Sequence, residues 1–183
     1  MARPVVNVLA LCGSLRAASI NAALLRAAAR LAPPGMTISL HAGLGELPLY
    51  TPDFERDVPA RGALFRAAVA HADALLIASP EYAHGVTGTI KNALDWLVSH
   101  EPFVQMPVAL FNAAPRAHHA DDALRETLVT MSAALVDAAS ITVPLPGTTW
   151  HDDAIVADVA LAHRIREALR ALLVFIEQTR DPG

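Results

Sequence analysis

The sequence predicts an α/β fold in which helices cover both faces of a doubly wound, five-stranded parallel sheet. Apolar runs alternate with segments of helical periodicity throughout the 183 residues, and that alternation is typical of parallel sheets with right-handed crossovers. No internal repeat or linker interrupts the pattern, so a single domain over 1–183 is expected. Five strands in this length favour the order 2-1-3-4-5, in which ligands lie beyond the strand C-termini, between strands one and three.

The expected strands are short apolar runs, as strands buried on both faces require. The first, VVNVLAL, is nearly continuous, and the third, ALLIA, has no polar residue. The last could begin as early as Val136. In chain order, we expect strands at 5–11, 37–40, 74–78, 107–111 and 140–143.

The expected helices show apolar residues three and four positions apart. The first ends before Pro33, Pro34 and Gly35, and the second starts at Pro59, where a missing N–H costs nothing. Inward-facing residues of the third are Ile90, Ala93, Leu94 and Leu97, and those of the fourth are Leu124, Leu128, Met131 and Leu135. In chain order, we expect helices at 21–31, 59–72, 89–98, 121–135 and 158–178. The Gly- and Pro-containing segments 43–55 and 79–88 are expected to be loops.

Composition narrows the classes of function. The chain is 54% hydrophobic and 17% charged, with a net charge of −4, so extended disorder is not expected. Lys and Arg are scattered and form no stripe for nucleic acid or an anionic membrane. No apolar run reaches the roughly 20 residues of a membrane span, and we expect a cytoplasmic protein. Cys12 is the only cysteine, which rules out a disulfide framework within the chain.

The stretch LCGSLRAASIN, at 11–21, joins the first strand to the first helix. Unpaired N–H groups and the helix dipole make such a helix start favourable for a phosphate. Gly13 permits a tight turn, and hydroxyl, guanidinium and amide groups could contact phosphate oxygens. The alternative interpretation is that Ser14, Ser19 and Asn21 are ordinary turn and cap residues.

The loop after the third strand reads SPEYAHGVTGTIKNALDW, and its Tyr82 could stack on a flat ligand. Together with GSLRAASINAALLRAA and LPLYTPDFE, this loop resembles the NAD(P)H-dependent FMN reductases of flavodoxin-like fold, which include bacterial quinone, chromate and azo-dye reductases. The three stretches occur in the family's order and span about the first 100 residues. The three stretches together are a strong indication of this family, whereas each stretch alone would be a moderate one.

The resemblance implies specific cofactor contacts. The positions that match the FMN phosphate loop are Ser14, Arg16, Ser19 and Asn21. Those that match the loop along the flavin ring are Pro80, Glu81, Tyr82 and Ala83. The helix residues Lys91, Asn92, Asp95 and Trp96 are interpreted as mainly structural, supporting that loop.

The resemblance also implies a reaction. NAD(P)H would deliver hydride to flavin N5, and a quinone, azo compound, metal oxyanion or free flavin would then take the electrons in a ping-pong cycle. Such a cycle needs no catalytic side chain, and none is assigned. Two alternatives are a flavodoxin-type electron carrier and a flavin-binding regulatory module without turnover. Alanine-rich third and fourth helices suggest a homodimer, with a homotetramer as the larger alternative.

The chain departs from the family at three places. Ala83 stands where Asn is common, Thr87 stands where Pro is common, and the segment NAAPRAHHADDALRE after the fourth strand has no glycine. Its His118, His119, Asp121 and Asp122 invite a metal-site interpretation, but they suit a solvated helix start better, and no metal site is predicted. Glu81 is expected to pair with an arginine of a second subunit or to face water.

Overall fold

The computed structural model of the chain describes residues 4–114, 116, 118–145 and 150–180. At its centre lies a parallel sheet in the order β2-β1-β3-β6-β7, and β8 also pairs with β6. The predicted order 2-1-3-4-5 is therefore confirmed. The strands of this sheet are β1 (Val6–Cys12), β2 (Met36–Leu40), β3 (Ala74–Ala78), β6 (Pro107–Asn112), β7 (Ala134–Leu135) and β8 (Ile141–Thr142).

The fifth strand position is divided between β7 and β8, with the 3₁₀ turn η4 (Asp137–Ala139) between them. The expectation of a helix reaching residue 135 is wrong. The helix α4 (His118–Thr130) ends earlier, and Ser132 has a φ of 62°, which takes the chain out of the helical conformation. Met131 and Leu135 still pack against the core. Their apolar character therefore reflects burial, although neither residue lies in a helix.

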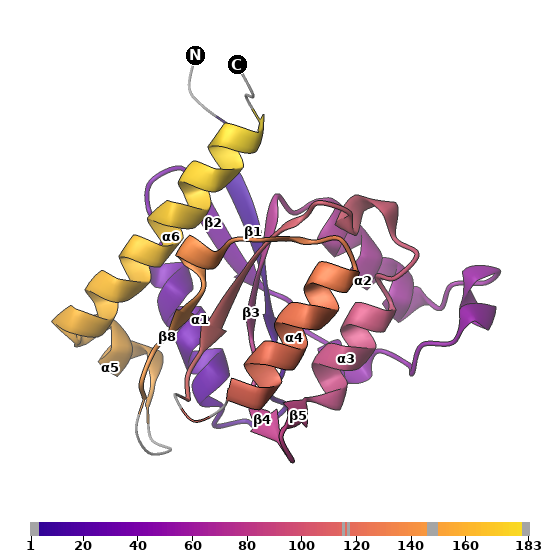
Figure 1. Cartoon of the computed structure of the whole chain (residues 1–183), viewed down its shortest axis with the longest axis horizontal. Coiled ribbons are helices and arrows are strands. Elements are labelled where there is room, and N and C mark those ends of the chain that lie inside the picture. The colour runs from indigo at the N-terminus through magenta and orange to yellow at the C-terminus, as the bar shows by residue number, and fades with distance from the viewer. Residues whose placement is uncertain (1–3, 115, 117, 146–149, 181–183) are drawn as a thin grey trace.

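The helices form a layer on each face of the sheet (Figure 1). On one face, α1 (Ile20–Arg30) and α6 (Val159–Arg180) pack against the inward side chains Val6, Val8 and Ala10 of β1. The opposite face is covered by α2 (Ala60–Ala70), α3 (Gly88–Asp95) and α4, which contact Leu9 and Leu11. Successive side chains of β1 therefore point alternately into the two hydrophobic cores, as expected for a strand that is buried on both faces.

A short helix, α5 (Asp152–Ala157), precedes α6 and lies outside the helix expected at 158–178. Its acidic first turn lies against α1: Asp152 accepts from Arg26 at 3.2 Å and from Arg30 at 3.0 Å, and Asp153 accepts from Arg30 at 2.6 Å. Asp153 and Asp152 raise the pKa of Arg30. These contacts join segments more than a hundred residues apart, so local periodicity could not reveal them. Across the described residues, each helix is too short or too polar to traverse a lipid bilayer.

Candidate functional site

The turns after β1 and β3 meet at the C-terminal edge of the sheet. Cys12 lies opposite Ala78 in the parallel ladder, and the Gly13 N–H donates to the Ala78 carbonyl at 2.8 Å. A Cβ on Gly13 would lie 2.2 Å from Ser79 Oγ and 2.7 Å from Ile90 Cγ1. Glycine is therefore required here by close packing, and the two segments that the sequence singled out are in contact.

The start of α1 combines a helix cap with a free amide group. Ser19 is the N-cap, and its Oγ accepts from the Ala22 N–H at 3.2 Å, so the cap interpretation holds for this residue. Asn21 is only 8% exposed, and its Oδ1 has no hydrogen-bond partner among the described residues. A buried amide of this kind is costly unless a ligand or water satisfies it. Ser14 and Arg16 are more open, and Ser14 Oγ accepts weakly from the Arg16 N–H at 3.4 Å.

These residues surround a cavity of about 390 Å³, which lies within the usual size range of ligand pockets. Seven of the eight predicted contact residues line the cavity, and the lining does not include Ala83. The predicted residues in the lining are Ser14, Arg16, Ser19, Asn21, Pro80, Glu81 and Tyr82. The phosphate loop and the ring loop, separate in the sequence, thus share one cavity.

The cavity also has walls that the sequence reasoning missed. The additional lining residues come from the start of α1 and from the segments after β3, β6 and β8. They are Ile20, Ser79, Ala113, Ala114, Arg116 and Leu145. Most of them sit just past strand C-termini, so the general rule for doubly wound sheets could have identified the segments but not the individual side chains. The glycine-free segment after β6 borders the cavity, with the Ala114 N–H donating to Asn112 Oδ1 at 2.9 Å.

The expected loop 79–88 contains a β-hairpin. Its strands are β4 (Glu81–Tyr82) and β5 (Gly85–Val86), with Tyr82 opposite Gly85. Ala83 and His84 form the turn with φ values of 49° and 58°, which matches the two positive φ angles of a type I′ turn. Ala-His lacks the Asn-Gly signature of that turn, which explains why the hairpin was not predicted. The turn leaves Tyr82 55% exposed at the cavity edge.

Glu81 connects the hairpin to α4. Its Oε2 accepts from the Ala120 N–H at 2.8 Å, in the first turn of α4, where a carboxylate is favourable. This contact within the chain was not expected, and pairing of Glu81 with an arginine of a second subunit stays a prediction. His118 and His119 belong to the same first turn, and so does Asp121. Within the described residues, no three His, Cys, Asp or Glu side chains are grouped to hold a metal ion.

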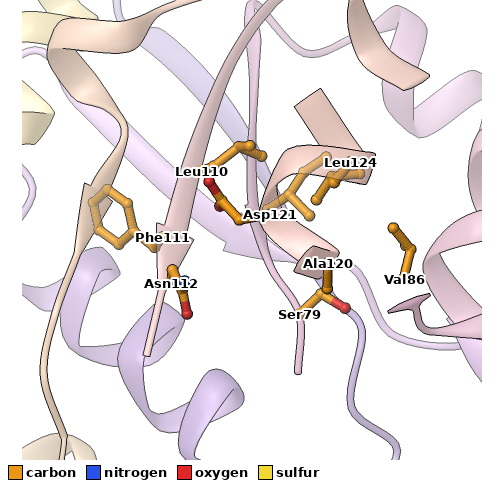
Figure 2. Close-up of a pocket in the computed structure, with 9 residues that line it drawn as sticks. Ser79, Val86, Leu110, Phe111, Asn112, Ala120, Asp121 and Leu124 are labelled. Atoms are coloured by element: carbon orange, nitrogen blue, oxygen red, sulfur yellow. The ribbon is translucent and has the colours of Figure 1, made fainter. Parts of the chain in front are cut away.

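A second cavity, of about 20 Å³, lies beneath the hairpin. Figure 2 shows Ser79, which follows β3, and Asn112, which ends β6, together with Ala120, Asp121 and Leu124 of α4 around it. That volume accommodates about one water molecule. Next to it, Ser79 Oγ lies 3.2 Å from Thr87 Oγ1, and Thr87 caps α3 by accepting from the Ile90 N–H at 3.4 Å. The Thr in place of the family's Pro is therefore a helix cap.

The helix α3 supports a different segment from the one expected. The Asn92 side chain accepts from the Tyr50 N–H at 2.9 Å and donates to the Pro48 carbonyl at 3.1 Å. The buried Trp96 donates its indole N–H to the same Pro48 carbonyl at 2.9 Å. The structural interpretation of Asn92 and Trp96 is thus confirmed, although they hold the segment around Pro48. Segment 43–55, expected to be loop, contains the 3₁₀ turns η1 (Leu44–Glu46) and η2 (Pro52–Glu55).

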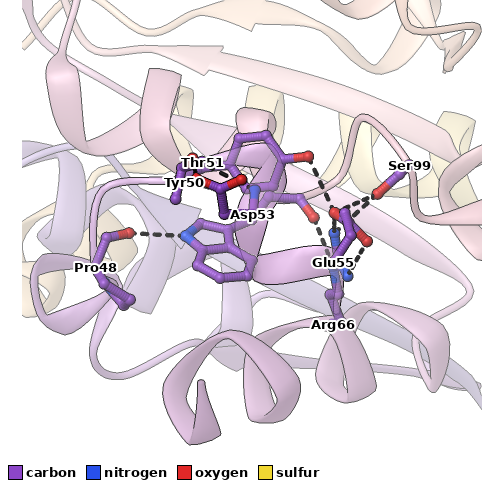
Figure 3. A network of polar contacts seen from close by, with 8 residues as sticks. Pro48, Tyr50, Thr51, Asp53, Glu55, Arg66 and Ser99 are labelled. Carbon is purple, nitrogen blue, oxygen red and sulfur yellow. Dashed lines mark hydrogen bonds and ion pairs between the residues drawn. The ribbon is translucent and has the colours of Figure 1, made fainter. Parts of the chain in front are cut away.

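Glu55 is the centre of a polar network on the same segment (Figure 3). Its carboxylate accepts from Arg66 at 2.5 and 3.1 Å, from Ser99 Oγ at 2.7 Å and from Tyr50 Oη at 3.0 Å. Arg66 also donates to the Trp96 carbonyl at 2.8 Å. The hydrogen bonds from Arg66, and then that from Ser99, lower the pKa of Glu55 from 4.5 to about 2.

This depressed pKa predicts an acid-sensitive contribution to stability. The contribution is present above the unfolded-state pKa near 4.5 and is lost as pH falls towards the folded-state pKa of about 2. The difference in unfolding free energy between the unmodified protein and Glu55→Gln should therefore shrink as pH falls through this window. Urea denaturation at several pH values measures it, with the exposed Asp57→Asn as control. A difference that is the same at pH 6 and pH 2.5 would contradict the assignment.

Comparisons with known proteins match most of the chain to flavin-dependent and quinone reductases. The family described as NADPH-dependent FMN reductase matches residues 6–145. An NAD(P)H-dependent FMN reductase of Pseudomonas aeruginosa is 32% identical over 96% of this chain and 97% of its own length. A quinone reductase of Pseudomonas putida is 35% identical over 68% of this chain and 70% of its own. The structure of a flavoenzyme NAD(P)H:(acceptor) oxidoreductase from Paracoccus denitrificans superposes with a TM-score of 0.77 at 27% identity, covering 95% of this chain and 98% of that one.

Proposed function

The chain belongs to the NADPH-dependent FMN reductase family, and from that premise we propose that it is an oxidoreductase that holds FMN in the cavity between α1 and the hairpin. NAD(P)H would be the electron donor, and a small molecule such as a quinone would be the acceptor. The observation that carries the proposal is the cavity itself, where seven residues predicted as FMN contacts converge.

The lining residues fit FMN in two parts. The N-terminus of α1, with Ser14, Arg16 and the unsatisfied amide of Asn21, offers donors for a phosphate. Rotating that amide by 180° would present its N–H₂ in place of Oδ1. Pro80, Glu81 and Tyr82 form a wall for a flat ring system. Because Glu81 is bonded to α4, this wall has a fixed position.

The protein's part in the reaction is to bind and to orient. When bound, FMN supplies hydride transfer, with donor and acceptor using one exposed face in turn. The turns after β1 and β3 would hold the two ends of the cofactor, and the exposed Tyr82 lies at the edge where a second planar molecule could enter. No side chain is required to donate or remove a proton for this role. The expected homodimer stays a prediction, and it would cover the exposed Val98, Val104 and Val129.

An absorption spectrum followed by anaerobic addition of NADPH tests the proposal. We expect the purified protein to show oxidised flavin bands that bleach rapidly when NADPH or NADH is added, and to recover them with a quinone. A protein that contains no flavin and takes up none on incubation with FMN would overturn it. Bound flavin that is reduced only slowly would favour the electron-carrier alternative, and bound flavin that neither nicotinamide nor a carrier protein reduces would favour a regulatory module.

A further inference from the structure

Arg116 is a cation at the cavity without an assigned partner. It follows β6, is exposed, and lines the same cavity as Arg16 and Glu81. The Glu81 carboxylate is engaged by the Ala120 N–H, and Arg16 is placed at the phosphate loop. Among the residues that the structure describes, no carboxylate forms an ion pair with Arg116. Its guanidinium group is therefore free to meet a molecule that enters the cavity.

Three imidazole rings in contact, called here the imidazole stack, connect the hairpin to the backbone of Arg116. The rings of His84 and His119 are stacked, with centroids 4.4 Å apart and planes inclined by 25°, and those of His118 and His119 are tilted by 36° at 4.0 Å. His118 Nδ1 lies 3.2 Å from the Arg116 carbonyl oxygen, to which it can donate. The stack therefore runs from the hairpin turn through the start of α4 to Arg116. With the bond between Glu81 and Ala120, it restrains this side of the cavity at two places.

Resting on the proposed function, we propose that Arg116 selects a redox partner that carries an anionic group, with the stack of His84, His119 and His118 as its positioning element. A guanidinium group binds carboxylate, sulfonate or phosphate oxygens through two parallel N–H bonds. The anion could belong to the electron acceptor or to the phosphate that distinguishes NADPH from NADH. Both sources present the same chemistry to Arg116, and they are separated by varying one reactant at a time.

The first experiment compares an anionic with a neutral acceptor of the same ring system. The holoprotein reduces 1,4-naphthoquinone-2-sulfonate or 1,4-naphthoquinone with NADH, and the ratio of the two kcat/KM values is recorded. Arg116→Ala should lower that ratio about tenfold, as expected for one exposed charge-assisted contact. The exposed Arg164→Ala, which makes the same charge change on α6, should leave it unchanged. Intrinsic differences between the quinones cancel when variants are compared.

A second arm holds the acceptor constant and compares NADPH with NADH. If the phosphate is the anion recognised, Arg116→Ala lowers the NADPH-to-NADH ratio of kcat/KM instead of the acceptor ratio. Whichever of the two ratios is lowered by Arg116→Ala should also be lowered in the unmodified protein when ionic strength is raised from about 0.02 M to about 0.5 M. The reason is that salt screens exposed charges. If neither ratio changes in Arg116→Ala, the inference is overturned.

The role of the imidazole stack is tested through Arg116. His119→Ala removes the central ring and should raise KM for the anionic reactant with little change in kcat. If the ring acts by positioning Arg116, His119→Ala should have no further effect on the ratio in an Arg116→Ala background. Independent, additive effects would overturn the positioning role. An unmodified protein that oxidises neither NADH nor NADPH with either quinone would overturn the proposed function itself, whereas turnover with both quinones and unchanged ratios overturns this inference alone.

Discussion

Replacing Ser14 and Arg16 together by alanine is expected to weaken FMN binding by at least about 100-fold. Hydrogen bonds to a charged group contribute roughly 1.5–3 kcal/mol each, and two such contacts to one phosphate would be lost. The fold should remain intact because both residues are partly or fully exposed, and the Oγ contact within the turn is long. Fluorescence titration of flavin-free protein with FMN measures the affinity, and circular dichroism with thermal unfolding reports on the fold.

A matched control for this double variant is Arg164→Ala, which removes one positive charge from the exposed side of α6. It should bind FMN like the unmodified protein, so a general effect of net charge would be recognised. Flavin affinity that is unchanged in Ser14→Ala with Arg16→Ala would show that the phosphate lies elsewhere. In that case the assignment of Asn21 would fail as well, because it rests on the same end of α1.

The second large effect is expected from Gly13→Ala. The added Cβ would overlap Ser79 Oγ and Ile90 Cγ1, at 2.2 and 2.7 Å. Neither neighbour can easily move, since Ser79 lies beside the buried Thr87 and Ile90 is fully buried in α3. Overpacking of this kind costs about 1–3 kcal/mol. Because the overlap separates the two loops that form the cavity, FMN retention should fall together with stability.

Gly88→Ala is the matched control for Gly13→Ala. Gly88 begins α3, its φ is not positive, and a Cβ built there meets nothing within 4 Å. Alanine at an exposed helical position is neutral or slightly stabilising. Urea denaturation should therefore separate the two variants by their midpoints, and flavin content should follow the same order. Equal stability of both variants would contradict the role assigned to Gly13.

Much of the site was predictable because its signals are local. The end of β1, the small-residue turn and the start of α1 follow one another within 11–21, and each has a recognisable composition. The same is true of β3 and the segment from Ser79 onwards. Since parallel strands end at one edge of the sheet, two such segments on neighbouring strands had to lie close together. That general rule placed the two segments together, and the family resemblance supplied the seven individual residues that line the cavity.

The predicted elements were wrong where buried residues had helical spacing outside a helix, or where a residue distant in the sequence stabilises an element. Met131 and Leu135 keep helical spacing, but Met131 lies in the turn after α4 and Leu135 in β7, because the positive φ of Ser132 ends the helical conformation. The first turn of α5 looks like a polar loop until Arg30 is seen beside it. The hairpin was missed because Ala83 and His84 do not have the usual composition of a type I′ turn.

The sequence by itself determined the doubly wound sheet, its strand order and the edge at which a ligand would bind, because apolar periodicity and strand direction are properties of short segments. Only the tertiary structure decided that Glu81 binds the start of α4, that Asn92 and Trp96 hold the chain at Pro48, and that Arg116 lines the cavity. Each of these facts depends on a contact between residues distant in the chain. Such contacts follow from the packing of whole elements, which no local pattern of residues encodes.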